Sequence, residues 1–64
     1  MILTDSQKRF LNSELRLECE DQFDRPWELI ENPDGEYEYL WSLMIGGRFV
    51  DALTPNFAKE VMAR

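Results

Sequence analysis

The residues most able to do chemistry in this chain are carboxylates crowded into its middle. Residues 14–38 contain ten Asp and Glu side chains but only Arg16 and Arg25, which gives this segment a net charge of −8. Residues 1–13 and 39–64 each carry +1, within a total of −6. Segregated charge creates an electrostatic field with a direction, which uniform acidity would not. Such groups could serve acid–base catalysis, or they could attract a basic partner.

Catalysis by these carboxylates is not favoured. One member of an acid–base pair must be buried so that its pKa rises, and a chain of 64 residues has little room for a deep substrate cavity beside its core. The sequence contains no histidine to activate Cys19 as a nucleophile. Glu18 and Glu20 are anionic neighbours that disfavour its thiolate. We therefore expect Cys19 to be a small buried hydrophobe and the protein not to be an enzyme.

No metal or cofactor site is predicted either. Asn32, Asp34 and Glu36 alternate as ligands do in a calcium loop. The calcium loop, however, has glycine at its sixth position and a bidentate Glu at its twelfth, whereas Gly35 is fourth here. Residues 32–35, with the sequence Asn-Pro-Asp-Gly, are better explained as a β-turn.

The elements that must position the acids begin with a predicted helix. Thr4 and Gln7 have the spacing of a capping box. Residues 15–20 alternate as in a strand, but we favour helix for residues 14–20 because Leu, Glu and Arg are good helix formers. Apolar residues that recur every four positions form one helical stripe. This stripe contains Leu11, Leu15, Cys19 and Phe23.

Three strands are predicted after Pro26, which breaks the helical pattern. Gly46 and Gly47 indicate a tight turn between the last two strands. In the second strand, alternation places Tyr37, Tyr39, Trp41 and Leu43 on one face. The expected strands cover residues 27–31, 36–43 and 48–53.

A second helix is predicted at the end of the chain. Thr54 is a suitable cap, and Pro55 suits the first helical position because its missing N–H costs nothing there. We expect Phe57, Val61 and Met62 to face the core. The order α-β-β-β-α indicates a small α+β domain over residues 1–64, in which a three-stranded antiparallel meander packs with N- and C-terminal helices.

The location of the protein is inferred from what the sequence lacks. Secreted domains of this size usually carry several disulfides, whereas this chain has one cysteine. There is no basic segment followed by a long apolar stretch at the N-terminus. We therefore expect a complete small gene product in the cytoplasm, without a membrane partner.

The acidic segment has two interpretations. It could be a solvated surface that resists aggregation, or it could imitate nucleic acid. Duplex DNA carries one negative charge per about 1.7 Å, so a charge of −8 corresponds to about 14 Å of duplex. Glu14 and Glu18 would lie one helical turn apart, and Glu36 and Glu38 would project from one strand face.

In its size, segregated acidity and lack of catalytic groups, the chain resembles the small phage-encoded anti-CRISPR proteins of the acidic, DNA-mimic type. The resemblance implies an inhibitor that binds the basic groove of a nucleic-acid-binding protein, such as a CRISPR-Cas effector or surveillance complex. It would block DNA or PAM recognition by placing carboxylates on the Arg and Lys side chains that hold phosphate. The implied partner-binding residues are Glu14, Glu18, Asp21, Asp24, Glu28, Glu31, Asp34, Glu36 and Glu38.

The alternative is an interaction module, such as an adaptor, an antitoxin or a subunit. It would bind through the aromatic strand face that carries Tyr37, Tyr39 and Trp41, if these side chains are exposed rather than part of the core. Direct stacking on nucleic acid is not expected, because Glu36 and Glu38 would repel phosphates. Solvent exposure of the aromatic face distinguishes these interpretations.

Overall fold

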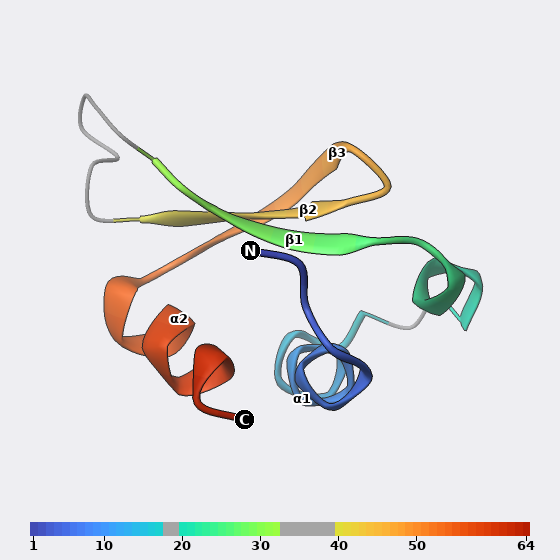
Figure 1. The fold of residues 1–64 in the computed structure, drawn as a ribbon, viewed down its shortest axis with the longest axis horizontal. Helices are drawn as coiled ribbons and strands as arrows, with labels where there is room; N and C mark the ends of the chain where they lie inside the picture. The colour runs from blue at the N-terminus through green and yellow to red at the C-terminus, as the bar shows by residue number, and fades with distance from the viewer. Residues whose placement is uncertain (18–19, 33–39) are drawn as a thin grey trace.

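The computed structural model describes residues 1–17, 20–32 and 40–64, and it confirms the predicted α+β class. The three strands form an antiparallel sheet in the order β1-β2-β3. Both α-helices lie on the same side of this sheet (Figure 1). The elements are α1 (Asp5–Leu15), the 3₁₀-helix η1 (Glu20–Asp24), β1 (Trp27–Glu31), β2 (Trp41–Ile45), β3 (Arg48–Leu53) and α2 (Pro55–Met62).

Helix α1 begins with the predicted capping box. The Thr4 hydroxyl accepts a hydrogen bond from the Gln7 backbone N–H at 3.3 Å, and Gln7 Oε1 accepts one from the Thr4 N–H at 2.8 Å. These two bonds satisfy donors that have no partner within the helix. The helix buries Gln7, Lys8 and Leu11 against the rest of the molecule.

The helix predicted over residues 14–20 is confirmed only for residues 14 and 15, because α1 ends at Leu15, and it is wrong for Arg16 and Leu17. Arg16 adopts the left-handed conformation, with φ 54° and ψ 47°. The Leu17 N–H then donates to the Asn12 carbonyl at 3.2 Å and closes the helix end. Arginine gives no sequence signal for this stop, since glycine is the usual residue there.

The early stop of α1 lets Phe23 pack where a continued helix could not place it. Phe23 belongs to η1, and its ring centroid lies 5.4 Å from that of Trp27. The predicted helical stripe therefore holds only for Leu11 and Leu15, which lie on α1 and pack in or against the core, and not for Phe23. Cys19, the remaining member of that stripe, lies outside the described residues.

Two of the three predicted strands match the structure at both ends, namely β1 and β3. Strand β2 agrees with the prediction only over residues 41–43 and continues to Ile45, while residues 36–39 lie outside the described part of the chain. The predicted turn occurs at Gly46 and Gly47, whose φ values are 59° and 80°. The predicted turn over residues 32–35 lies mostly outside the described residues.

The N-terminal residues pair with β1, which the sequence did not predict. The Leu29 N–H donates to the Met1 carbonyl at 2.9 Å, and the Leu3 N–H donates to the Trp27 carbonyl at 2.8 Å. Ile2 lies opposite Glu28 in an antiparallel bridge. Three residues are too few for a recognisable alternating pattern, but they cover the edge of β1 that would otherwise be free.

The core lies between the sheet and the helices. Trp27 is fully buried, and its indole N–H donates to the Gln22 carbonyl at 2.8 Å, so its one polar atom is satisfied. All core residues come from the elements already described and from the N-terminal segment. They are Leu3, Leu11, Trp27, Leu29, Leu43, Ile45, Leu53, Ala58 and Val61.

Helix α2 follows the prediction. The Thr54 hydroxyl accepts a hydrogen bond from the Phe57 N–H at 3.2 Å, and Pro55 occupies the first turn. Val61 is fully buried, and Phe57 and Met62 pack against the core while remaining partly exposed.

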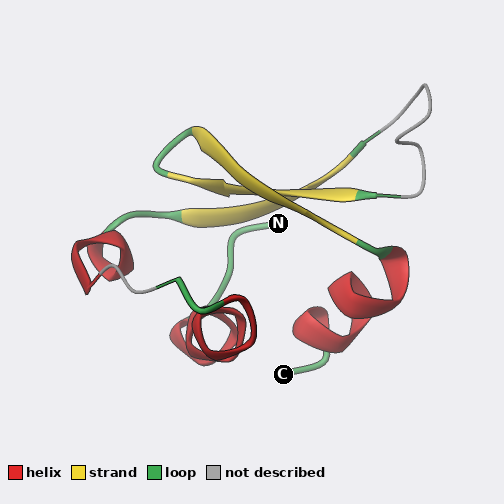
Figure 2. Cartoon of the chain, turned by 180° about the vertical axis from the view of Figure 1, so that it is seen from behind, coloured by secondary structure: helices red, strands yellow, loops and turns green. Residues whose placement is uncertain are grey.

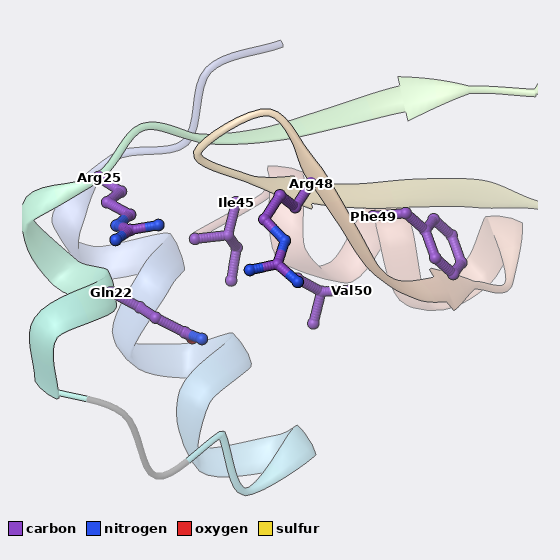
Figure 3. A pocket seen from close by; sticks show the side chains of 6 residues that line it. All are labelled: Gln22, Arg25, Ile45, Arg48, Phe49 and Val50. Carbon is purple, nitrogen blue, oxygen red and sulfur yellow. The ribbon is translucent and has the colours of Figure 1, made fainter.

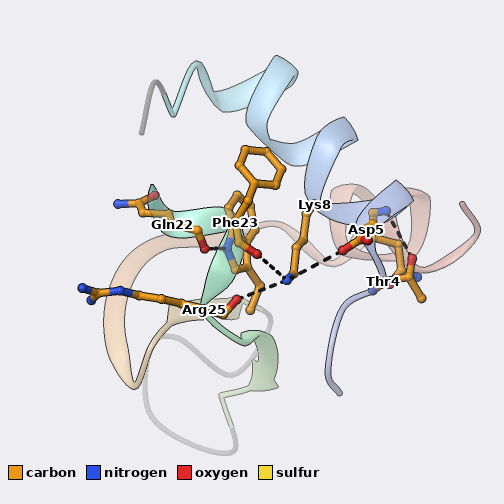
Figure 4. Close-up of polar contacts among 8 residues, drawn as sticks. Thr4, Asp5, Lys8, Gln22, Phe23 and Arg25 are labelled. Atoms are coloured by element: carbon orange, nitrogen blue, oxygen red, sulfur yellow. Dashed lines mark hydrogen bonds and ion pairs between the residues drawn. The ribbon is translucent and has the colours of Figure 1, made fainter. Parts of the chain in front are cut away.

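A buried lysine ties α1 to the end of η1. Lys8 is only 8% exposed, and its ammonium group donates to the carbonyl oxygens of Phe23 at 3.2 Å and Arg25 at 3.1 Å (Figure 4). Asp5 Oδ1 lies 4.0 Å away. Because the last carbonyls of a helix lack partners within it, a cation is well placed at this position.

Candidate interaction surfaces

The side of the sheet opposite α1 and α2 carries no helix in the described chain (Figure 2). Trp27 and Leu29 face the helices, so Glu28 and Ile30 must project from the other side of β1. Strand register extends this side into two rows across the sheet, which together we call the open face. One row holds Ile2, Glu28, Met44 and Phe49, and the other holds Ile30, Ser42 and Ala52.

The open face is largely apolar. Among the described residues, four large hydrophobic side chains are exposed, and three of them lie here: Ile2 at 61%, Phe49 at 61% and Ile30 at 43%. A single exposed apolar residue is ordinary, but a contiguous group indicates a binding surface. A hollow of about 260 Å³ adjoins the group and is lined by Asn32, Leu40, Ser42, Phe49 and Ala52.

The neighbouring edge strand β3 has features that discourage pairing with another strand. The β2–β3 register shifts between Leu43 and Met44, which marks a bulge. Asp51 Oδ1 accepts a hydrogen bond from the Ala52 N–H at 2.8 Å, so that main-chain donor is occupied. Bulges and charged groups on an edge strand both oppose the addition of a further strand. The surface available to a partner is therefore the open face rather than the edge.

Four of the predicted partner-binding acids have described side chains. Glu14 is exposed on α1, Asp24 is exposed at the end of η1, and Glu31 is exposed at the end of β1. Glu28 is half-buried on the open face, and its Oε2 lies 3.8 Å from the amino group of Met1.

These four acids do not gather on one surface. Glu28 and Glu31 are three residues apart on one strand, so they project from opposite sides of the sheet. Asp24 precedes β1 whereas Glu31 ends it, so a whole strand separates them. Asp21 belongs to η1. The other predicted acids, Glu18, Asp34, Glu36 and Glu38, lie outside the described residues.

The aromatic face predicted on the second strand is described only in part. Trp41 is half-buried and packs against the core on the same side of β2 as Leu43, which supports its assignment to the core. Tyr37 and Tyr39 lie outside the described residues.

The apolar group on the open face was not predicted as a site. Its sequence signal is that apolar residues occupy consecutive strand positions and so project from both sides of the sheet, as Leu29 and Ile30 do. That pattern would also fit a strand buried on both sides, and only the placement of both helices on one side of the sheet separates the two cases.

None of the helices in the described part of the chain has the length and apolar character needed to cross a membrane. Comparison with known proteins gives no family to draw on, because no protein-family model, curated protein or solved structure matches this chain.

Proposed function

We propose that this chain is a small non-catalytic binding protein whose open face contacts a partner protein. The supporting observation is that Ile2, Ile30 and Phe49 are exposed together on the side of the sheet away from the helices. Burying such a side chain contributes about 1.5–3 kcal/mol. Three of them on one side of the sheet, with Phe49 also lining a hollow, form the apolar centre typical of a protein interface.

The partner is a basic protein with an apolar patch of its own. The chain as a whole carries a net charge of −6, whereas Glu28 on the open face is paired with the amino group of Met1 at 3.8 Å. A second copy would bring the same excess of negative charge to this surface, whereas a basic partner would be attracted to it. Binding should therefore weaken as salt rises, because exposed charges are screened.

This proposal is tested by replacing Phe49 or Ile30 with threonine, which preserves strand propensity but removes apolar area. The immobilised protein is used to isolate a basic partner from bacterial lysate, and the affinity of the purified pair is measured. Phe49→Thr and Ile30→Thr should each weaken binding at least about tenfold, as expected at an interface centre. Asn56→Thr, at an exposed position on α2, is the control and should bind normally.

Unchanged binding by both open-face variants would contradict the proposal. Sedimentation of the isolated chain provides a second check. A stable dimer that Phe49→Thr abolishes would show that a second copy, rather than a basic partner, occupies the open face.

We propose a second candidate function, which is inhibition of a nucleic-acid-binding protein by DNA mimicry, with a CRISPR-Cas effector as the target. It is supported by the net charge of −8 over residues 14–38. Glu14, Asp24 and Glu31 are exposed, and none of them forms an ion pair with a basic group in the described part of the chain. Carboxylates that are not neutralised internally can contact the arginines that hold DNA.

Competition with DNA for a purified Cas effector tests this second function. The triple variant Glu14→Gln, Asp24→Asn and Glu31→Gln should lose inhibition, whereas Phe49→Thr should retain it. The matched control is Asp5→Asn, Asp51→Asn and Glu60→Gln, which removes equal charge from outside the acidic segment. Inhibition that survives the first triple variant, or that both triples lose equally, would contradict mimicry by these residues.

A further inference from the structure

A second hollow, of about 280 Å³, lies at the end of the sheet where β2 turns into β3. Residues from three separate parts of the chain meet there. Gln22 comes from η1, Arg25 from the connection to β1, and Ile45, Arg48, Phe49 and Val50 from β2 and β3. Figure 3 shows the side chains of Arg25 and Gln22 extending from one side and that of Arg48 from the other, into the space around Ile45.

The fold places the backbones of both arginines next to the β2–β3 turn. The Gly46 N–H donates to the Pro26 carbonyl at 2.9 Å, which holds the β2–β3 turn against the residue that follows Arg25. The Arg25 side chain lies along this turn, since a Cβ atom placed on Gly46 would come within 3.0 Å of Arg25 Cδ. Arg48 leads out of the same turn and pairs with Ile45. The two guanidinium groups are therefore brought to one hollow by tertiary structure.

This concentration of positive charge is unusual for the molecule. The chain has only seven basic residues against thirteen acidic ones, yet two of the seven line one hollow. Neither Arg25 nor Arg48 forms an ion pair with a carboxylate among the described residues. Two guanidinium groups repel each other, and an anion between them would be attracted to both. Each offers a planar set of donors that matches the oxygens of phosphate or carboxylate.

Gln22 also lines the hollow, and its side-chain NH₂ group can donate hydrogen bonds to an oxyanion. Its Oε1 atom is buried and has no hydrogen-bond donor in the described chain. Because neighbouring atoms cover this oxygen completely, a ligand in the hollow cannot reach it.

We propose that this hollow binds an oxyanion, a phosphate or carboxylate group, through Arg25 and Arg48, with the Gln22 side-chain NH₂ group as a further donor. Its volume is below the 300–1,000 Å³ typical of drug-sized ligand sites. The site therefore suits a single charged group with a small body, and Ile45 and Val50 provide apolar walls for that body. This inference does not depend on which partner binds the open face.

The test is an NMR titration of the ¹⁵N-labelled chain with sodium phosphate and, separately, with sodium acetate, with sodium chloride adjusted to keep ionic strength constant. We expect saturable shifts of the Arg25 and Arg48 side-chain N–H signals and of the Gly46 and Gly47 amides. Arg25→Gln and Arg48→Gln should each weaken binding at least about tenfold, because each removes charge-assisted hydrogen bonds. Lys59→Gln removes the same charge from an exposed site on α2 and should bind normally.

The two anions distinguish the possible sources of the ligand group. Saturation by phosphate alone indicates a phosphate-bearing ligand, saturation by acetate alone indicates a carboxylate, and saturation by both indicates a general oxyanion site; all three support the proposal. Linear shifts with both anions would overturn it. Saturable shifts that persist in both arginine variants would overturn it as well. Both arginines are exposed, so the variants should fold, and their amide spectra check this directly.

Discussion

The ammonium group of Lys8 donates a hydrogen bond to the carbonyl oxygen of Arg25 over 3.1 Å, across seventeen positions of the chain. The same group donates to the Phe23 carbonyl at 3.2 Å. Lysine is rarely buried without such partners. Through these bonds α1 holds the segment that leads into β1, and with it the main chain of Arg25, which lines the oxyanion hollow.

Replacing Lys8 with methionine should destabilise the fold. Methionine fills a similar volume but cannot donate, so the two carbonyls lose a charged donor, at a cost of about 1.5–3 kcal/mol. Lys59→Met, at an exposed position, is the matched control and should change the free energy of unfolding by less than about 0.5 kcal/mol. Urea unfolding monitored by circular dichroism measures both. Equal stability of the two variants would show that the Lys8 hydrogen bonds contribute nothing net.

Removing the N-terminal cap of α1 should also be costly. Thr4→Ala deletes the hydroxyl that accepts from Gln7, and the loss of such a cap costs about 1 kcal/mol. For a domain of this size, that lowers the melting temperature by about 4–8 °C. Ser13→Ala lies at an exposed position within the same helix and should be neutral or slightly stabilising, because alanine is the better helix former. A melting temperature unchanged by Thr4→Ala would contradict the role of the capping box.

Replacement by phenylalanine should destabilise the protein more at Trp27 than at Trp41. Trp27→Phe removes the hydrogen bond to the Gln22 carbonyl and leaves a small cavity, for a combined loss of about 2–3 kcal/mol. Trp41→Phe changes a half-buried side chain and should cost less than about 1.5 kcal/mol. The Trp41→Phe protein also isolates the fluorescence of Trp27, which should be blue-shifted and resistant to quenching by iodide. Emission typical of a solvent-exposed indole would contradict the burial of Trp27.

Gly46 and Gly47 should respond differently to alanine. Both have positive φ, so either substitution strains the backbone by about 1–2 kcal/mol. Only at Gly46 does the added Cβ meet a neighbour, the Arg25 side chain at 3.0 Å, whereas nothing lies within 4 Å of the corresponding position at Gly47. Gly46→Ala should therefore destabilise the protein more than Gly47→Ala does.

A double-mutant cycle separates the contact from the backbone strain. Truncating Arg25 to alanine should lower the destabilisation caused by Gly46→Ala to the level of backbone strain alone. The destabilisation caused by Gly47→Ala should not change, and urea unfolding measures both. If the two glycine substitutions cost the same in both backgrounds, Arg25 does not pack on the turn. The location of one of the two proposed anion-binding arginines would then be wrong.

Local signals in the sequence determined most of the secondary structure. The capping box at Thr4, the cap at Thr54 followed by Pro55, and the Gly46–Gly47 turn each depend on residues close in the chain, so their chemistry is visible before folding. The strand ranges of β1 and β3 followed from residue types and breakers. The end of α1 did not, because Arg16 takes a left-handed conformation that its residue type does not favour.

The surfaces were decided by tertiary structure. Charge density along the chain is a one-dimensional property, whereas strand alternation sends Glu28 and Glu31 to opposite sides of the sheet. Likewise, Ile30 and Phe49 became a surface because both helices packed on the other side, and Arg25 met Arg48 because the β2–β3 turn docks on Pro26. Long-range contacts set these relations, and no spacing within the sequence encodes them.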